Sequence, residues 1–87
     1  MTTYAVTWMM DAVYDSERLE RSAADPVSVR EAAAKVDTVL RRLPLDVGES
    51  RSGTNRLWYG DVLGVYYRVD EVARTVRILA VAPARRR

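Results

Sequence analysis

The chain has 87 residues, of which 48% are hydrophobic and 30% are charged, a composition typical of a folded domain and not of a disordered chain. It contains no histidine and no cysteine, which excludes disulfides, thiolate nucleophiles, imidazole bases and zinc sites of the usual kind. No apolar run approaches the length of about 18 residues that a membrane span needs, and no signal peptide opens the chain. We therefore expect a soluble cytoplasmic protein with one domain over residues 1–87 and no membrane partner.

The net charge of +2 conceals an uneven distribution along the chain. Residues 1–50 carry nine acidic and six basic side chains, a net charge of −3, whereas residues 51–87 carry eight arginines against three carboxylates, a net charge of +5. Basic surfaces attract phosphate groups and acidic proteins. The C-terminal half is therefore expected to contribute a basic face.

The first part of the chain is predicted to form a strand followed by a helix. In the opening TTYAVTW, the large residues Tyr4, Val6 and Trp8 alternate with smaller ones, which is the two-residue period of a strand with one buried face. Over residues 9–24 the period changes, and apolar residues recur at helical spacing. These residues are predicted to form the first helix.

A second helix is predicted to follow directly. Asp25 is a good N-cap and Pro26 a good first helical residue, although Ser28, with a glutamate three residues later, makes a competing capping box. Pro44 ends the helix. Between these limits an apolar stripe recurs at helical spacing, formed by Val29, Ala33, Val36, Leu40 and Leu43. Two adjacent amphipathic helices are expected to pack as an antiparallel hairpin.

The remainder of the chain is predicted to form a sheet. Residues 56–59, 62–69 and 75–81 are rich in Val, Tyr, Trp, Leu and Ile, and their short connections indicate an antiparallel meander. The polar segment GESRSGTNR, residues 48–56, is predicted to be the loop that enters this sheet. The fold class is therefore α+β in the order β-α-α-β-β-β, with a helical hairpin packed on a small antiparallel sheet. Residues 82–87 are expected to form a flexible basic tail.

Arginine and tyrosine are the residue types that could carry a function, because together they contact phosphate groups and stack on bases. The alternation within residues 62–69 is expected to bury Tyr67 and to place Tyr66 and Arg68 on the other face of the strand. The candidates for binding a nucleic acid or an acidic partner are Arg51, Arg56, Arg68, Arg77, Tyr66 and Arg85. The acidic residues form no cluster of hard oxygen ligands, and the glycines match no phosphate-binding motif, so no metal and no cofactor is expected.

Taken in order, five segments resemble the RelE/ParE superfamily, the small basic toxins of type II toxin–antitoxin systems. These segments are YAVTW, VREAAAKVDTVLRRLP, GESRSGTNR, GVYYRVD and VRILAV. The resemblance covers residues 3–82, and its most specific portion is the helix ending in Arg-Leu-Pro, followed by residues 48–51 and by Arg56 at the start of a strand. It implies the same β-α-α-β-β-β topology and a cognate antitoxin as partner.

The activity that the resemblance implies divides in two, since RelE-like members cut mRNA at the ribosome and ParE-like members poison DNA gyrase. The cutting members use, without a metal, an arginine on the middle strand and, after the last strand, an arginine with a tyrosine or histidine. Here the first two positions hold Gly64 and Ala84, with Arg85 next to the latter, and no tyrosine or histidine follows Tyr67. The resemblance therefore implies a toxin that acts by binding. A metal-free mRNA endoribonuclease and a diverged, non-toxic relative are the alternatives.

Different roles are expected for the residues of the loop and for the other basic residues. Glu49 and Arg51 are expected to hold the loop. Arg56 is expected to open a strand beside the basic face, where an acidic antitoxin or a phosphate backbone would lie. Arg85 belongs to a terminal run of arginines that is expected to be a solvated tail, with nonspecific affinity for phosphate as the alternative. A segment of the antitoxin is expected to become ordered as it covers the sheet and the helical groove.

Overall fold

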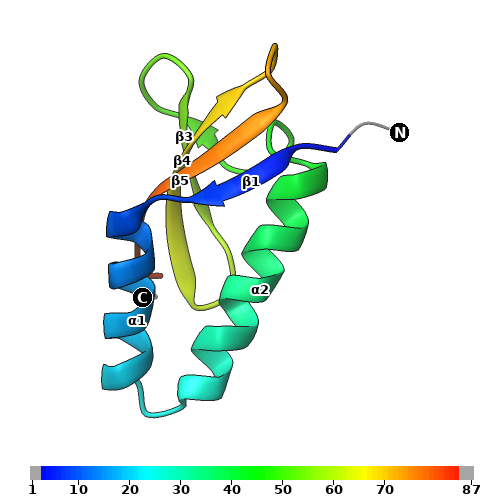
Figure 1. The fold of residues 1–87 in the computed structure, drawn as a ribbon. Coiled ribbons are helices and arrows are strands. Elements are labelled where there is room, and N and C mark those ends of the chain that lie inside the picture. Colours follow the sequence, from blue (N-terminus) through cyan, green and yellow to red (C-terminus); the bar gives the residue numbers. More distant parts are fainter. Residues whose placement is uncertain (1–2, 85–87) are drawn as a thin grey trace.

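One strand, two helices and four further strands follow one another within residues 3–84, the part of the chain that this computed structural model describes (Figure 1). In chain order they are β1 (Ala5–Trp8), α1 (Met10–Ser22), α2 (Pro26–Arg42), β2 (Glu49–Ser50), β3 (Asn55–Tyr59), β4 (Leu63–Asp70) and β5 (Thr75–Pro83). Both predicted helices and the three strands of the predicted meander are confirmed, with ends that shift by a residue or two. The short strand β2 lies inside the segment that was predicted to be a loop.

The start of α2 follows from its capping residue. The Asp25 carboxylate accepts hydrogen bonds from the backbone nitrogen of Ser28 at 3.3 Å and from its hydroxyl at 2.7 Å. These bonds, the hydroxyl bond above all, favour the ionised carboxylate and lower the pKa of Asp25. Pro26 is the first helical residue, so the competing start at Ser28 is wrong. Neither helix among residues 3–84 is long and apolar enough to cross a membrane.

The sheet is mixed, with the strand order β1-β5-β4-β3-β2. Strands β3, β4 and β5 pair antiparallel as predicted, but β1 pairs parallel with β5, from Ala5 opposite Thr75 to Trp8 opposite Ile78. The expectation of a purely antiparallel sheet is therefore wrong. Parallel neighbours need a long connection, and here all the other helices and strands lie between β1 and β5 in the sequence.

The C-terminal strand extends further than predicted. Ala82 and Pro83 were expected to belong to the flexible tail, but they pair with Gly64 and Leu63 as the last residues of β5. The backbone nitrogen of Ala84 then donates a hydrogen bond to the carbonyl oxygen of Val62 at 2.9 Å. The tail expectation is wrong for residues 82 and 83, and residues 85–87 lie outside the described part of the chain.

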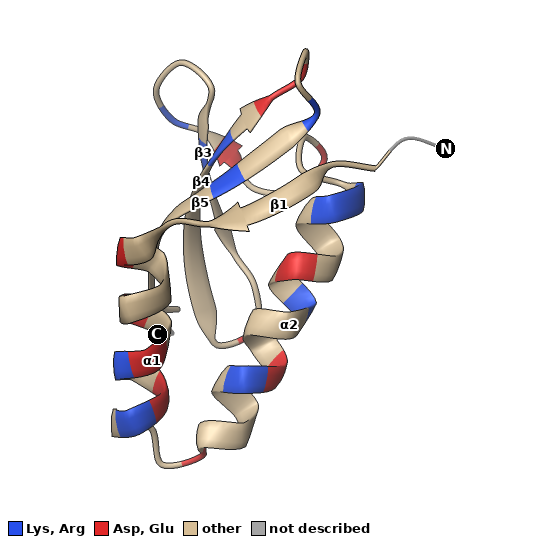
Figure 2. Cartoon of the chain, viewed as in Figure 1, with Lys and Arg blue, Asp and Glu red and all other residues tan. Residues whose placement is uncertain are grey.

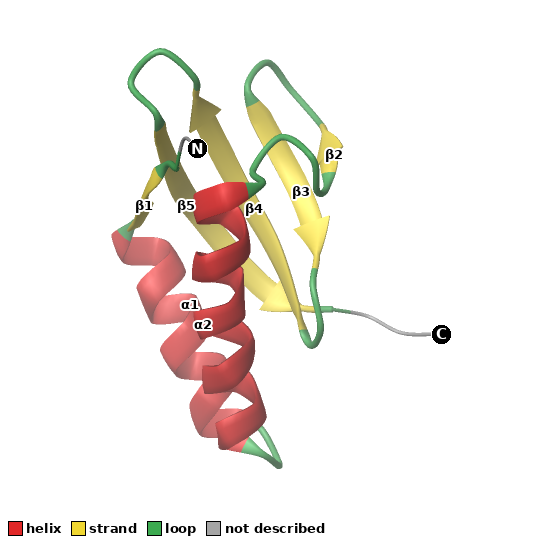
Figure 3. Ribbon diagram, turned by 90° about the vertical axis from the view of Figure 1, so that its right-hand side faces the viewer, coloured by secondary structure: helices red, strands yellow, loops and turns green. Residues whose placement is uncertain are grey.

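The helical hairpin covers one face of the sheet, and the core lies between the two layers (Figure 3). Alternate residues of β4 and β5 point into it, in agreement with the two-residue period. Full burial of each such side chain contributes about 1.5–3 kcal/mol. The largest side chains buried in this layer are Tyr67, Leu40, Leu63, Ile78, Val36, Val65 and Val76.

A bulge in β5 marks the point where helix replaces strand along the edge of the sheet. Tyr66 pairs with Ala80 and Tyr67 with Ile78, so Leu79 is an extra residue on β5. β1 ends beside this bulge, and α1 then runs next to β5. Its Asp15 carboxylate accepts a hydrogen bond from the backbone nitrogen of Val81 at 3.1 Å. A side chain thus takes the place of the missing strand partner.

Gly48 occupies a position that we expect no other residue to tolerate. It has a φ of +73°, and a Cβ atom there would lie 2.7 Å from the carbonyl oxygen of Leu57. Gly53 also has a positive φ, of +60°, but open space surrounds it. Gly53→Ala should therefore cost only the left-handed backbone strain of about 1 kcal/mol, and Gly48→Ala at least about 2 kcal/mol. Urea unfolding of both variants measures the difference, and equal losses would contradict the proposed clash.

Candidate binding face

The face of the sheet opposite the helical hairpin carries no helix within residues 3–84 (Figure 3). Its side chains alternate with those of the core, and the pairing of the strands places them in three rows across β5, β4 and β3. The rows are Arg77–Arg68–Asn55, Ala80–Tyr66–Leu57 and Ala82–Gly64–Tyr59. We call this surface the open face.

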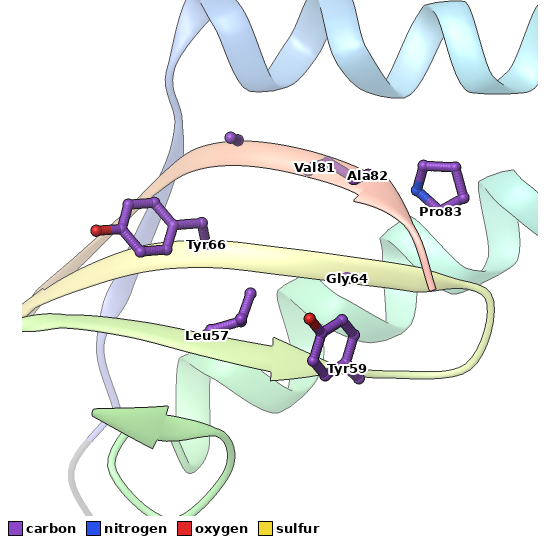
Figure 4. Close-up of a pocket in the computed structure, with 8 residues that line it drawn as sticks. Leu57, Tyr59, Gly64, Tyr66, Val81, Ala82 and Pro83 are labelled. Atoms are coloured by element: carbon purple, nitrogen blue, oxygen red, sulfur yellow. The ribbon is translucent and has the colours of Figure 1, made fainter. Parts of the chain in front are cut away.

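Two of the three rows form a shallow apolar pocket of about 330 Å³, which we call the open-face groove (Figure 4). It is lined by Leu57, Tyr59, Gly64, Tyr66, Ala80, Val81, Ala82 and Pro83. Gly64 leaves space in the groove because it has no side chain. A Cβ atom at this position would lie 3.0 Å from the Tyr59 ring. Tyr59 is 61% exposed, so its ring presents an apolar surface to solvent. We therefore take the open-face groove as the candidate interaction site of this chain.

The remaining row carries two arginines side by side. Arg68 on β4 lies directly opposite Arg77 on β5, and both are exposed. The Nε of Arg68 donates to the Asn55 side-chain oxygen at 2.9 Å, and the Asn55 amide donates to the Tyr66 hydroxyl at 2.8 Å. Within residues 3–84 neither guanidinium forms an ion pair with a carboxylate. Like charges that face each other across strands are destabilising, so this pair favours an external anion.

The arginine pair lies at one end of the open face. Figure 2 shows basic and acidic residues on the part of the sheet away from the tip of the helical hairpin, and both helices also carry charges of both signs. Asp70 and Glu71 also border this end of the sheet. The Asp70 carboxylate accepts a hydrogen bond from the backbone nitrogen of Ala73 at 3.0 Å, so it is engaged in the turn between β4 and β5.

The Arg56 side chain contacts the backbone of the segment that precedes β2. It pairs with Tyr67 across β3 and β4, on the helix side of the sheet and not on the open face. Its Nη2 donates to the carbonyl oxygens of Leu45, Val47 and Gly48, at 3.2 Å each. Arg56 thus stands near the start of β3, as expected, but its side chain turns to the face of the sheet opposite the Arg68–Arg77 pair. Arg56 holds the segment between α2 and β2, and a role for it in binding a partner stays a prediction.

Tyr67 holds the same segment from inside the core. Its ring is fully buried, as predicted, and its hydroxyl donates to the carbonyl oxygens of Pro44 at 2.8 Å and Val47 at 3.0 Å. Burial raises the pKa of Tyr67, although the neighbouring Arg56 opposes this shift. Arg56 and Tyr67 thus converge on one stretch of backbone, residues 44–48, and fix the path from the second helix into the sheet.

The other predicted residues divide between the loop and the open face. Arg51 forms an ion pair with Glu49 at 3.2 Å, a contact within the loop that the two residues were expected to hold. Both are exposed, so the pair contributes less than about 1 kcal/mol. Tyr66 and Arg68 share the open face as predicted, and Arg85 lies outside the described residues. Within residues 3–84 no group of three or more acidic residues could hold a metal ion.

The sequence does not predict the part that Asn55 takes on this face. An asparagine at the start of a strand resembles any loop residue. Its contacts with Arg68 and Tyr66 become visible only when the pairing of β3 with β4 is known. Leu57 likewise joins the groove only through that pairing. The arrangement as a whole offers an apolar floor with two arginines at one end.

Three of the solved structures that share this fold belong to toxin–antitoxin systems. A chain of the toxin–antitoxin complex RelBE2 from Mycobacterium tuberculosis is 26% identical, over 95% of this chain and 93% of its own, with a TM-score of 0.78. A chain of the chromosomal ParDE system from P. aeruginosa is 13% identical, over 94% and 97%, with a TM-score of 0.70. The isolated E. coli RelE toxin is 15% identical, over 97% and 87%, with a TM-score of 0.64.

These likenesses extend over nearly the whole of each chain and concern the fold. No protein-family model matches the sequence, and no curated protein sequence matches it significantly. A helical hairpin on one face of a five-stranded mixed sheet, with the other face open, defines a class of small α+β proteins. The chain has the fold of the RelE/ParE toxin superfamily.

Proposed function

We propose that this protein is the toxin of a type II toxin–antitoxin system, that it acts in the cytoplasm by binding its target, and that a cognate antitoxin neutralises it. The observation that carries this proposal is the likeness to a chain of the RelBE2 complex over 95% of this chain. The likeness to a chain of the ParDE system, over 94%, adds support. The open-face groove lies beside Arg68 and Arg77, which form no ion pair within residues 3–84, and together they supply a surface suited to an acidic protein partner.

Binding is favoured over RNA cleavage by what the open face lacks. Gly64 leaves the middle strand without a side chain at the position where cutting members of the superfamily carry an arginine. The chain contains no histidine, and no tyrosine follows Tyr67. Each group that moves a proton or stabilises charge in a transition state contributes on the order of 10²-fold to the rate. A nuclease that lacks two such groups would be slow.

Induction of the protein alone in a bacterial host is expected to stop growth. DNA synthesis should fail before protein synthesis, and ribosome-bound mRNA should stay intact, because a binding toxin of the ParE kind acts on gyrase. The measurements are colony counts, the two rates of synthesis and the integrity of an abundant mRNA. The variant Tyr67→Ala, which should be folded to a much smaller extent in the host, shows whether overproduction of the chain alone slows growth.

Two outcomes would contradict the proposal in different ways. Cleavage of mRNA at the ribosome, lost when Arg68 and Arg77 are both replaced by alanine, would assign the endoribonuclease activity instead. Normal growth in the presence of folded wild-type protein would assign a diverged relative that has kept the fold without the toxicity. Inhibition of gyrase by the purified protein would support the target that the resemblance implies.

A further inference from the structure

We propose that two copies of this chain associate as a weak two-fold dimer in which their α1 helices pack antiparallel. The contact surface is a groove of about 460 Å³ between α1 and β5, which we call the α1 groove. It is lined by Asp11, Tyr14, Asp15, Arg18, Arg21, Leu79 and Ala80. This inference concerns a surface beside the open face and does not depend on toxic activity.

The helix α1 carries charges of both signs (Figure 2), and several of them in the α1 groove are available to another molecule. Asp11 and Arg21 are both exposed, and within residues 3–84 neither forms an ion pair. Arg18 lies 3.7 Å from Asp15, but 69% of its side chain is exposed. Tyr14 is 56% exposed. The groove therefore presents an acidic end and a basic end, with an aromatic ring between them.

The order of these residues along α1 is self-complementary. Asp11 and Arg21 are equally far from Ser16 in the sequence, and so are Tyr14 and Arg18. When two α1 helices lie antiparallel about a two-fold axis at Ser16, Asp11 faces Arg21 of the second copy. Tyr14 then faces Arg18 of the second copy, which places a guanidinium against an aromatic ring. Because the axis repeats every contact, a single arrangement satisfies both kinds of pair twice.

The α1 groove suits a helix of a second copy better than a nucleic acid. Asp11 and Asp15 line it beside the arginines and would repel a phosphate backbone. Leu79, the extra residue of the β5 bulge, and Ala80 form an apolar wall on the other side. A helix satisfies its own backbone groups, so it can lie against this wall without unpaired polar atoms. Tyrosine and arginine are also enriched at protein–protein interfaces.

The contact is small, so the expected dimer is weak. The helix α1 has 13 residues, which makes it about 20 Å long. One such helix with one edge of β5 covers less than the area of about 800 Å² per partner in a standard interface. We expect a dissociation constant between about 10 µM and 1 mM. Sedimentation equilibrium of the whole chain measures it, and added salt should weaken the association.

Charge reversal tests the proposed pairing directly. Asp11→Arg and Arg21→Asp each bring like charges together at both copies of the contact, so each should weaken dimerisation at least about tenfold. Both changes in one chain should restore dimerisation to within about threefold of the wild type. An equimolar mixture of the two single variants should also associate. Positions 11 and 21 are about 15 Å apart along one helix, so the rescue can come only from contact between copies.

Glu31→Arg is the matched control, because it changes the charge by the same amount as Asp11→Arg at an exposed position of α2. It should change dimerisation by less than about threefold. Glu31→Arg combined with Arg21→Asp restores the net charge without the pairing, so it should stay at least about tenfold weaker than the wild type. Tyr14→Ala removes the ring at the other contact and should also weaken the dimer. Circular dichroism shows whether each variant is folded.

Several results would overturn the inference. One is a wild-type chain that stays monomeric up to about 2 mM. Another is a double variant of Asp11 and Arg21 that associates as weakly as the single variants, or a Glu31→Arg variant that is equally impaired. A dimer that survives both single reversals would show that two copies meet through another surface. The growth assay measures toxicity independently, so failure of the dimer and failure of the proposed function are distinguishable.

Discussion

Replacing Tyr67 by alanine is expected to lower the free energy of unfolding by about 3–5 kcal/mol. The ring is fully buried among the helices and strands of the core, and its hydroxyl donates to the carbonyl oxygens of Pro44 and Val47. Tyr67→Phe keeps the ring and removes these hydrogen bonds, so it should cost about 1–3 kcal/mol. Urea unfolding followed by circular dichroism measures both losses. A loss for Tyr67→Phe as large as that for Tyr67→Ala would contradict the assignment of most of the effect to packing.

The same residue makes stability depend on pH in the alkaline range. Burial raises the pKa of Tyr67 above its ordinary value of 10.0, so the folded protein keeps this proton at a pH where the unfolded chain has released it. The contribution to stability is therefore fully present below pH 10 and is lost as the pH rises through the higher pKa of the folded state. Wild-type stability should fall more steeply above pH 10 than that of Tyr67→Phe. Parallel curves would contradict this.

Replacing Arg56 by alanine is expected to lower the free energy of unfolding by about 2–3 kcal/mol. The variant would leave the carbonyl oxygens of Leu45, Val47 and Gly48 without the guanidinium that joins them. Arg51→Ala is the matched control, because its guanidinium pairs with the exposed Glu49 and should cost less than about 1 kcal/mol. Equal losses for the two arginines, measured by urea unfolding, would contradict the structural role of Arg56.

A double-mutant cycle isolates the shared contact of the two residues. Arg56 and Tyr67 both donate to the carbonyl oxygen of Val47, so their effects should not add. We expect a coupling energy of about 0.5–3 kcal/mol between Arg56→Ala and Tyr67→Phe. Simple additivity would show that the two side chains hold the segment independently. The result also bears on function. If an Arg56 variant lost toxicity, the cause would be loss of folding as much as loss of target binding.

The sequence predicts those parts of the fold that depend on residues close together along the chain. Asp25 and Pro26 mark the start of α2 through a local capping contact. The alternation around Tyr67 separates the core face of β4 from the open face. Short turns between β3, β4 and β5 determine their antiparallel pairing. In each case the physical cause lies within a few residues, so periodicity and turn chemistry suffice.

Features that depend on distant pairing could not be predicted in this way. No local signal reports that β1 joins β5 in parallel, or that Arg56 faces the carbonyl oxygens of a preceding segment. The local sequence around an arginine at the start of a strand is the same whether its side chain binds another protein or the backbone of its own chain. The arginine pair depends on the register that sets Arg68 opposite Arg77, and a shift of one residue would have moved one of them to the other face.

The way in which α1 follows β5 past the bulge also affects how molecules of this protein meet one another. Exposed strand edges are the sites at which sheets grow from one molecule to the next, and natural proteins protect them. Beyond Ile78 the edge of β5 meets the Asp15 carboxylate at Val81, and Pro83 has no N–H to offer. The strands at the two ends of the sheet, β1 and β2, are four and two residues long. The unpaired backbone that another chain could extend into a larger sheet is therefore short. We expect this to limit aggregation, although the surface carries an apolar groove.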